Sequence, residues 1–179
     1  MNSWIVLLRG INVGGKNIVP MKQLAEMLVS LGCQNVQTYI QSGNVLLQHP
    51  ESNAQVLSKI LANGILQTFG FQPQLLLLTL AQLEQVAANN PFQSAQSEPK
   101  TLHVFFLAEP STASTLEPLT MLKTESESFS LVDQVFYLHA PEGIGRSKLA
   151  AKVEKILGVA TTARNWNTVS QLLTLANRN

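Results

Sequence analysis

The stretch Val36-Gln37-Thr38-Tyr39-Ile40-Gln41-Ser42-Gly43-Asn44-Val45-Leu46-Leu47-Gln48 decides the fold of the first half of the chain. In its first six residues, β-branched side chains at 36, 38 and 40 alternate with the other side chains, as in a half-buried strand. Ser42-Gly43 is a turn dipeptide, and the residues from Asn44 to Gln48 again favour a strand. The stretch therefore predicts a β-hairpin.

The segments on either side of this hairpin extend the pattern in both directions. Apolar residues recur at helical spacing from Met21 to a stop at Gly32, and again from Val56 to about Phe69. Strands are predicted outside these helices, over Trp4 to Arg9 and Gln74 to Thr79. The order strand, helix, strand, strand, helix, strand is that of a ferredoxin-like unit.

The second half repeats this order without detectable sequence identity to the first. Strands are predicted over 101–107, 128–132, 134–139 and 160–163, and helices within 111–123 and over 147–157. Two further helices are predicted over 80–89, with Thr79 as N-cap, and 168–176. Residues 89–92 and the polar run 93–100 form the clearest linker. We predict an α+β fold, a duplication of two packed ferredoxin-like (βαββαβ) subdomains at residues 1–90 and 91–179.

The composition is that of an ordinary globular protein, with 45% hydrophobic and 13% charged residues. The longest apolar runs, such as 104–108, are far too short to cross a membrane, so no membrane partner is expected. The apolar run at the N-terminus has no charged leader, and Cys33 is the only cysteine. These features predict a cytoplasmic protein without structural disulfides.

The charges are distributed unevenly although the net charge is only +1. Residues 84–142 carry two basic and eight acidic side chains, whereas residues 143–179 carry six basic side chains and one acidic one. This asymmetry is compatible with an acidic partner that is steered to one face, and equally with a basic helix packed beside an acidic one.

The segment Leu8-Arg9-Gly10-Ile11-Asn12-Val13-Gly14-Gly15-Lys16-Asn17 follows the first predicted strand and is rich in glycine and basic residues. The spacing Gly10-x4-Gly15-Lys16 resembles most of a phosphate-binding P-loop. However, Asn17 replaces the hydroxyl residue that binds magnesium, and Pro20, expected at the first helical position, delays the helix beyond the lysine. The segment therefore favours a non-P-loop anion site or a tight surface connection in which glycine supplies positive φ.

Three segments, residues 8–17, 145–149 and 161–168, place cations beside Gly, Ser or Asn at the predicted ends of strands and starts of helices, and a fourth, residues 38–44, supplies neutral donors. Arginine binds phosphate through two hydrogen bonds at once, and a helix N-terminus also favours anions. The candidate ligand-binding residues are Arg9, Gly10, Asn12, Gly14, Gly15, Lys16, Gln41, Ser42, Asn44, Arg146, Ser147, Lys148, Arg164, Asn165 and Trp166. No metal site is indicated, because the three histidines and Cys33 lack zinc-ligand spacing. No catalytic residue or cofactor is indicated either.

The same four segments carry a resemblance to a known family. They are residues 8–17, 38–44, 145–149 and 161–168. Together they resemble a bacterial family of uncharacterised proteins, a domain of unknown function, marked by the opening Arg-Gly-Ile-Asn-Val-Gly-Gly at residues 9–15. The resemblance implies two α+β ferredoxin-like subdomains, and it implies no activity, cofactor or catalytic residue.

Three interpretations of these segments remain open from the sequence. The first is a binding protein for a phosphate-bearing small molecule or nucleic acid; no particular protein partner is indicated. The second is an enzyme that acts on a small anionic metabolite, with the same side chains clamping its transition state. In the third, the motifs are structural: Asn12 and Asn44 satisfy turns, Ser147 caps a helix, and Trp166 belongs to the core.

Overall fold

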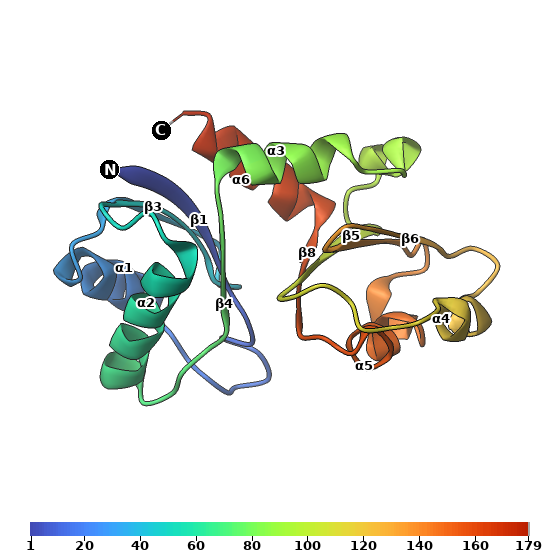
Figure 1. Ribbon diagram of the computed structural model, residues 1–179, viewed down its shortest axis with the longest axis horizontal. Coiled ribbons are helices and arrows are strands. Elements are labelled where there is room, and N and C mark those ends of the chain that lie inside the picture. Colours follow the sequence, from blue (N-terminus) through green and yellow to red (C-terminus); the bar gives the residue numbers. More distant parts are fainter. Residues whose placement is uncertain (179) are drawn as a thin grey trace. The chain divides into compact units, whose positions relative to one another are not determined.

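The computed structural model describes residues 1–178, within which two four-stranded antiparallel sheets and six α-helices form (Figure 1). Contacts between Cα atoms divide the chain into two compact units. The first comprises Met1–Glu84 together with the residues from Leu172 onward, and the second comprises Gln85–Gln171. The division of the chain at residue 90 stays a prediction, and Asn179 lies outside the described residues.

The first unit contains a mixed sequence of strands and helices around one sheet. Its elements are β1 (Asn2–Leu8), α1 (Met21–Ser30), β2 (Gln34–Tyr39), β3 (Asn44–His49), α2 (Ala54–Phe69) and β4 (Leu75–Leu78). The strands lie in the order β2-β3-β1-β4, and every neighbouring pair is antiparallel. The predicted hairpin over residues 36–48 is therefore present as β2 and β3.

Alternation along β1 divides its side chains between the two faces of this sheet. Trp4, Val6 and Leu8 pack with apolar residues of α1 and α2 into one buried cluster. Ile5 and Leu7 face the opposite side of the sheet and are also buried. Because both faces are apolar, the strand is a continuous hydrophobic run.

Side chains fix where the helices of the first unit begin and end. Asn53 caps α2 by accepting hydrogen bonds from the backbone N–H groups of Gln55 and Val56, and Gly70 ends the helix in a left-handed conformation. The helix α3 (Leu80–Ala88) begins with a capping box. In it, the Gln82 N–H donates to Thr79 Oγ1 (3.2 Å), and the Thr79 N–H donates to Gln82 Oε1 (2.8 Å).

The second unit repeats the order of elements. They are β5 (Leu102–Leu107), α4 (Glu117–Leu122), β6 (Ser128–Val132), β7 (Val135–His139), α5 (Val153–Leu157) and β8 (Thr161–Asn165). The sheet order is β6-β7-β5-β8, again antiparallel throughout. Its main core contains a T-shaped contact between Phe105 and Phe136, packed with α4 and α5. Helix α6 (Trp166–Ala176) follows β8 directly.

Two expected elements differ from those observed. The helix predicted over 147–157 is a 3₁₀ turn, Ala150–Lys152, followed by the shorter α5. The polar linker over 93–100 contains a 3₁₀ helix, Gln93–Ser97, with Ala95 buried. Helical periodicity does not distinguish a 3₁₀ turn from the first turn of an α-helix, which explains the longer prediction.

Candidate functional site

The loop between β1 and α1 is a small closed hairpin. Val13 and Lys16 form an isolated antiparallel bridge, and the Lys16 N–H donates to the Val13 carbonyl (3.0 Å). Gly14 (φ 58°) and Gly15 (φ 73°) lie between them, both in the left-handed region. Positive φ at both central residues is the requirement of a type I′ turn, which glycine meets at low cost.

Two asparagine side chains hold this loop closed from within. Asn12 Nδ2 donates to the carbonyls of Val19 (3.0 Å) and Gln41 (2.8 Å), while its Oδ1 accepts from the Val19 N–H (2.8 Å). Asn17 Nδ2 donates to the Gly10 carbonyl (3.0 Å), and the Asn12 N–H donates to the Asn17 carbonyl (3.1 Å). Asn12 thus joins three segments: its own loop, the approach to α1, and the β2–β3 turn.

This geometry differs from that of a P-loop. In a P-loop the lysine begins a helix and the backbone amides around it point at phosphate. Here the Lys16 amide is used within the turn, and α1 begins only at Met21. Pro20, expected at the first helical position, is instead the N-cap residue with an extended ψ of 126°. The loop therefore presents side chains rather than a cradle of amides.

The outer surface of the loop is both basic and aliphatic. Lys16 is exposed, and a Cβ added at Gly14 or Gly15 would meet no atom within 4 Å. Val13 (65% exposed) follows Asn12 in the chain, and Ile18 (59% exposed) precedes Val19, to which Asn12 bonds. Sequence reasoning missed these aliphatic residues, because an apolar residue in a loop gives no sign of its exposure.

The β2–β3 turn contributes a third exposed aliphatic side chain. Ile40 is 51% exposed and has a φ of 50°, which is costly for a β-branched residue. The carbonyl of the next residue, Gln41, accepts the hydrogen bond from Asn12, which ties this turn to the 10–17 loop. The backbone strain at Ile40 is not offset by burial of its side chain. This marks the turn as a candidate contact surface.

The remaining candidates of the first unit divide into exposed and buried groups. Gln41 and Ser42 are exposed, whereas Asn44 is fully buried and donates from Nδ2 to the Tyr39 carbonyl (3.1 Å) and to Ser42 Oγ (2.9 Å). Arg9 is half-buried, and its Nη1 donates to Gln74 Oε1 (2.7 Å). Asn44 therefore holds the β2–β3 turn, and Arg9 is anchored beside the start of β4.

In the second unit, two cations flank a structural serine. Ser147 is buried, and its Oγ accepts from the Ala150 N–H (3.0 Å), so it caps the turn that leads into α5. Arg146 and Lys148 on either side are exposed. The geometry gives Ser147 a capping role and leaves the two cations at the surface.

The segment from Arg164 to Trp166 joins β8 to α6. Asn165 Oδ1 accepts from the Thr168 N–H (3.0 Å) and so caps α6, and the Trp166 indole is only 5% exposed. A buried indole offers little surface on which a base could stack. Arg164 is half-buried and donates from Nη1 to the Ala163 carbonyl (2.8 Å), and burial lowers the pKa of its guanidinium to about 10. The side chain is therefore still cationic at neutral pH.

Two buried titratable groups, Cys33 and Tyr137, are poorly suited to nucleophilic or proton-transfer chemistry. Burial raises the pKa of the Cys33 thiol to about 11, so little thiolate forms at neutral pH. Burial also raises the pKa of Tyr137 to about 12, and its hydroxyl donates to the Val86 carbonyl (2.7 Å). Among residues 1–178, no group of three or more His, Cys, Asp or Glu side chains is arranged to hold a metal ion.

A family model described as "Protein of unknown function (DUF1697)" matches residues 1–137. The chain belongs to this family. The matched region includes the first unit's loop segments at 8–17 and 38–44, whereas the segments at 145–149 and 161–168 lie beyond it. The expected resemblance to a domain-of-unknown-function family is therefore confirmed, and family membership brings no assigned activity.

Among solved structures, this DUF1697 member is similar to a conserved bacterial protein, SP0830, from Streptococcus pneumoniae. The TM-score is 0.70 with 24% sequence identity, over 97% of this chain and 98% of the other. At this identity the likeness shows a shared fold alone. A comparison with curated proteins gave no match.

No α-helix within residues 1–178 combines the length and the apolar character needed to cross a bilayer.

Proposed function

We propose that this DUF1697 protein is a binding protein for a phosphate-bearing ligand, a nucleotide or nucleic acid, which it contacts through the loop of residues 9–17. One observation carries the proposal. The side chains of Asn12 and Asn17 form hydrogen bonds that hold the loop together, whereas the Lys16 side chain at its turn is exposed. A cation on a loop that is already ordered loses little conformational entropy when it binds an anion.

The glycines of the turn support the same proposal. Space is open beyond Gly14 and Gly15, so an oxygen-rich group can approach the backbone beside the lysine. The exposed aliphatic side chains Val13, Ile18 and Ile40 supply an apolar surface for the base or sugar of such a ligand. Four of the candidate residues have structural roles: Asn12, Asn44, Ser147 and Asn165. The exposed cations Arg146 and Lys148 of the second unit form a separate set of candidate phosphate contacts.

The ligand class is tested by thermal shift at low and high salt with nucleotides, sugar phosphates, short oligonucleotides and inorganic anions. A ligand at a hundred times its dissociation constant adds about 2.7 kcal/mol to the free energy of unfolding. For a chain of this size the melting temperature should then rise by roughly 5–10 °C. A rise confined to one phosphate class supports the proposal. Rises with every polyanion that vanish in salt indicate only a basic surface, and no rise contradicts the proposal.

A matched pair of lysine variants locates the contact. Lys16→Ala should weaken binding of the ligand class found by about tenfold, the cost of one charge-assisted hydrogen bond. Lys59→Ala removes another exposed lysine, from α2, and should leave binding unchanged. Equal effects of the two substitutions would contradict a site at the loop. Turnover of a small anionic metabolite, lost in Lys16→Ala or Ser42→Ala while binding persists, would replace the binding proposal with the enzymatic one.

We further propose that each half has a ferredoxin-like fold and that the two arose by duplication in a bacterial cytoplasmic protein. The repeated order β-α-β-β-α-β and the matching strand orders β2-β3-β1-β4 and β6-β7-β5-β8 support the fold. They place the first and third strands of each unit side by side, as the split βαβ arrangement requires. On this proposal the halves are residues 1–90 and 91–179, with helix α6 as a C-terminal addition.

A further inference from the structure

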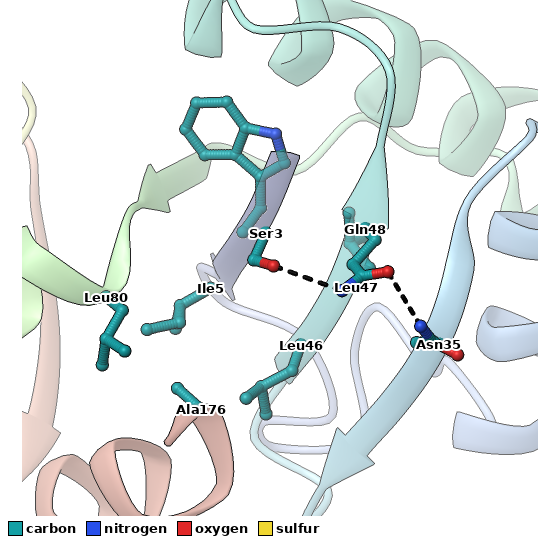
Figure 2. A pocket seen from close by; sticks show the side chains of 9 residues that line it. Ser3, Ile5, Asn35, Leu46, Leu47, Gln48, Leu80 and Ala176 are labelled. Atoms are coloured by element: carbon teal, nitrogen blue, oxygen red, sulfur yellow. Dashed lines mark hydrogen bonds between the residues drawn. The ribbon is translucent and has the colours of Figure 1, made fainter. Parts of the chain in front are cut away.

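The first unit contains a cavity on the face of its sheet opposite α1 and α2. Its volume is about 200 Å³, and it lies between β1 and β3 on one side and the start of α3 and the end of α6 on the other. Figure 2 shows Ile5, Leu46, Leu80 and Ala176 around a common space. All four are apolar, so the body of the cavity favours an apolar occupant.

One side of the cavity is polar and uncharged. Asn35 Nδ2 donates to Gln48 Oε1 (2.8 Å), and Gln48 Nε2 lies 3.4 Å from Ser3 Oγ, so that three side chains form a row along the rim (Figure 2). These two contacts use one acceptor and one donor position of the Gln48 amide. An amide has two donor hydrogens and an oxygen with two lone pairs, so the row retains capacity for a further hydrogen bond.

The backbone of β2 is distorted where it supplies this row. The register between β2 and β3 shifts between Gln34 and Gln37, and Asn35 has a φ of 50°. A bulge of this kind turns a side chain out of its regular position in the strand. Here the bulge accompanies an asparagine that reaches across to Gln48, which places the polar row at the edge of an apolar cavity.

We propose that this cavity binds a small neutral organic molecule that has a compact apolar body and one hydroxyl or amide group. An apolar cavity of about 150 Å³ is known to hold benzene, so about 200 Å³ suits a single ring with one or two further heavy atoms. The hydroxyl or amide bonds to the row Ser3-Gln48-Asn35, while the ring contacts Ile5, Leu46, Leu80 and Ala176. No charged side chain lines the cavity within residues 1–178, so a carboxylate or phosphate would lose hydration without compensation. This site is independent of the phosphate contact proposed at Lys16.

Three probes of similar size test the proposal on the full chain: benzyl alcohol, toluene and benzoate. Binding is followed by protein-observed NMR titration. Benzyl alcohol should bind more tightly than toluene, and benzoate should bind at least tenfold more weakly than benzyl alcohol. Benzoate that binds as well as benzyl alcohol, or the absence of binding by all three probes, would overturn the proposal.

A substitution that fills the cavity locates the probe. Ala176→Leu should weaken benzyl alcohol binding at least tenfold, whereas Ala81→Leu, the same change at an exposed position of α3, should leave it unchanged. If Ala176→Leu does not fold, Leu80→Phe serves the same purpose from another wall. Gln48→Met keeps the shape of the rim without its amide and should abolish the preference for benzyl alcohol over toluene. A raised melting temperature in Ala176→Leu, with no probe binding to the parent, would show a simple packing void and contradict the site.

Discussion

At the scale of single residues, asparagine and glycine determine the chain reversals of the first unit. Asn12 joins its own loop to Val19 and Gln41, and Asn44 closes the β2–β3 turn onto Tyr39, through hydrogen bonds of 2.8–3.1 Å. Gly43 has a φ of 80° and lies against Leu8, at the end of β1, and Ile11. The loop and the β2–β3 turn therefore depend on each other, and the exposed cation at Lys16 rests on a framework of uncharged residues.

Gly43 and Gly10 provide a matched comparison of strain with and without a steric clash. Both have positive φ, but a Cβ at Gly43 would lie 2.7 Å from Leu8 Cβ and 2.9 Å from Ile11 Cδ1, whereas a Cβ at Gly10 meets nothing within 4 Å. Gly10→Ala should cost about 1–2 kcal/mol from backbone conformation alone. Gly43→Ala should cost about 1–3 kcal/mol more because of the clash. Urea unfolding of the two variants measures the difference, and equal losses would contradict the contact.

His103 should make the stability of the protein depend on pH. Its side chain is 8% exposed, its Nε2 has no hydrogen-bond partner among the described residues, and burial lowers the pKa of its imidazole. The unfolded chain binds a proton below about pH 6.5 while the folded chain does not, so the free energy of unfolding should fall as the pH drops through this value. The decrease from this group should not exceed about 1.4 kcal/mol per pH unit, and it should stop below the pKa of the folded state.

The variant His103→Leu isolates this contribution, because all other titrating groups are shared with the parent. The difference in free energy of unfolding between the two proteins should change between pH 7 and pH 5, in favour of His103→Leu at the lower pH. A difference that stays constant over this range would show that the imidazole titrates alike in the folded and unfolded chains.

At the scale of elements, local sequence signals set most boundaries. Thr79 and Gln82 form a reciprocal capping box at the start of α3, and Asn53 and Gly70 bound α2. These residues are short-range signals, so they can be recognised without knowledge of the tertiary contacts. The prediction of Thr79 as an N-cap is confirmed. By contrast, the 3₁₀ turn before α5 depends on the cap at Ser147 and on packing that no local pattern reveals.

The capping box gives a direct test at this scale. Thr79→Ala should lower the free energy of unfolding by about 1 kcal/mol, since the Gln82 N–H loses its partner. Thr79→Ser keeps the hydroxyl and should recover most of this loss. Thermal and urea unfolding of both variants measure the effect. If serine is as destabilising as alanine, the Thr79 methyl group rather than the hydrogen bond stabilises the helix start.

At the scale of the whole molecule, two continuous helices contribute residues to both units. The division falls within α3, after Glu84, and within α6, before Leu172. A helix forms cooperatively along its length, so the stability of each unit should be coupled to that of the other. The chain should therefore unfold as one cooperative body in spite of its two separate sheets.

The two tryptophans allow this coupling to be measured, because Trp4 lies in the first unit and Trp166 in the second. In Trp166→Phe the remaining fluorescence reports the first unit, and in Trp4→Phe it reports the second. Within each variant, the urea midpoint from fluorescence should coincide with that from far-UV circular dichroism, which follows both units. Separate midpoints within one variant would show that the units unfold independently.

Much of the architecture could be predicted from the sequence, and the candidate site much less. Hydrophobic periodicity and turn residues indicated the α+β class, the strands and the hairpin at residues 36–48, because these signals are local. The roles of Asn12 and Asn44 depend on partners up to 29 residues away, as in the bond from Asn12 to Gln41. The exposure of Val13, Ile18 and Ile40, and the cavity beside Asn35, arise from tertiary packing. No spacing in the sequence encodes them.

The central proposal, a phosphate contact at the 9–17 loop, is tested most directly by ¹⁵N-resolved NMR of the protein titrated with the phosphate-bearing ligand found by thermal shift. We expect the largest amide shifts at Gly14, Gly15 and Lys16, with smaller shifts at the β2–β3 turn, and their loss in Lys16→Ala but not in Lys59→Ala. Amide shifts that leave residues 10–17 unaffected, or that persist unchanged in Lys16→Ala, would contradict the proposal.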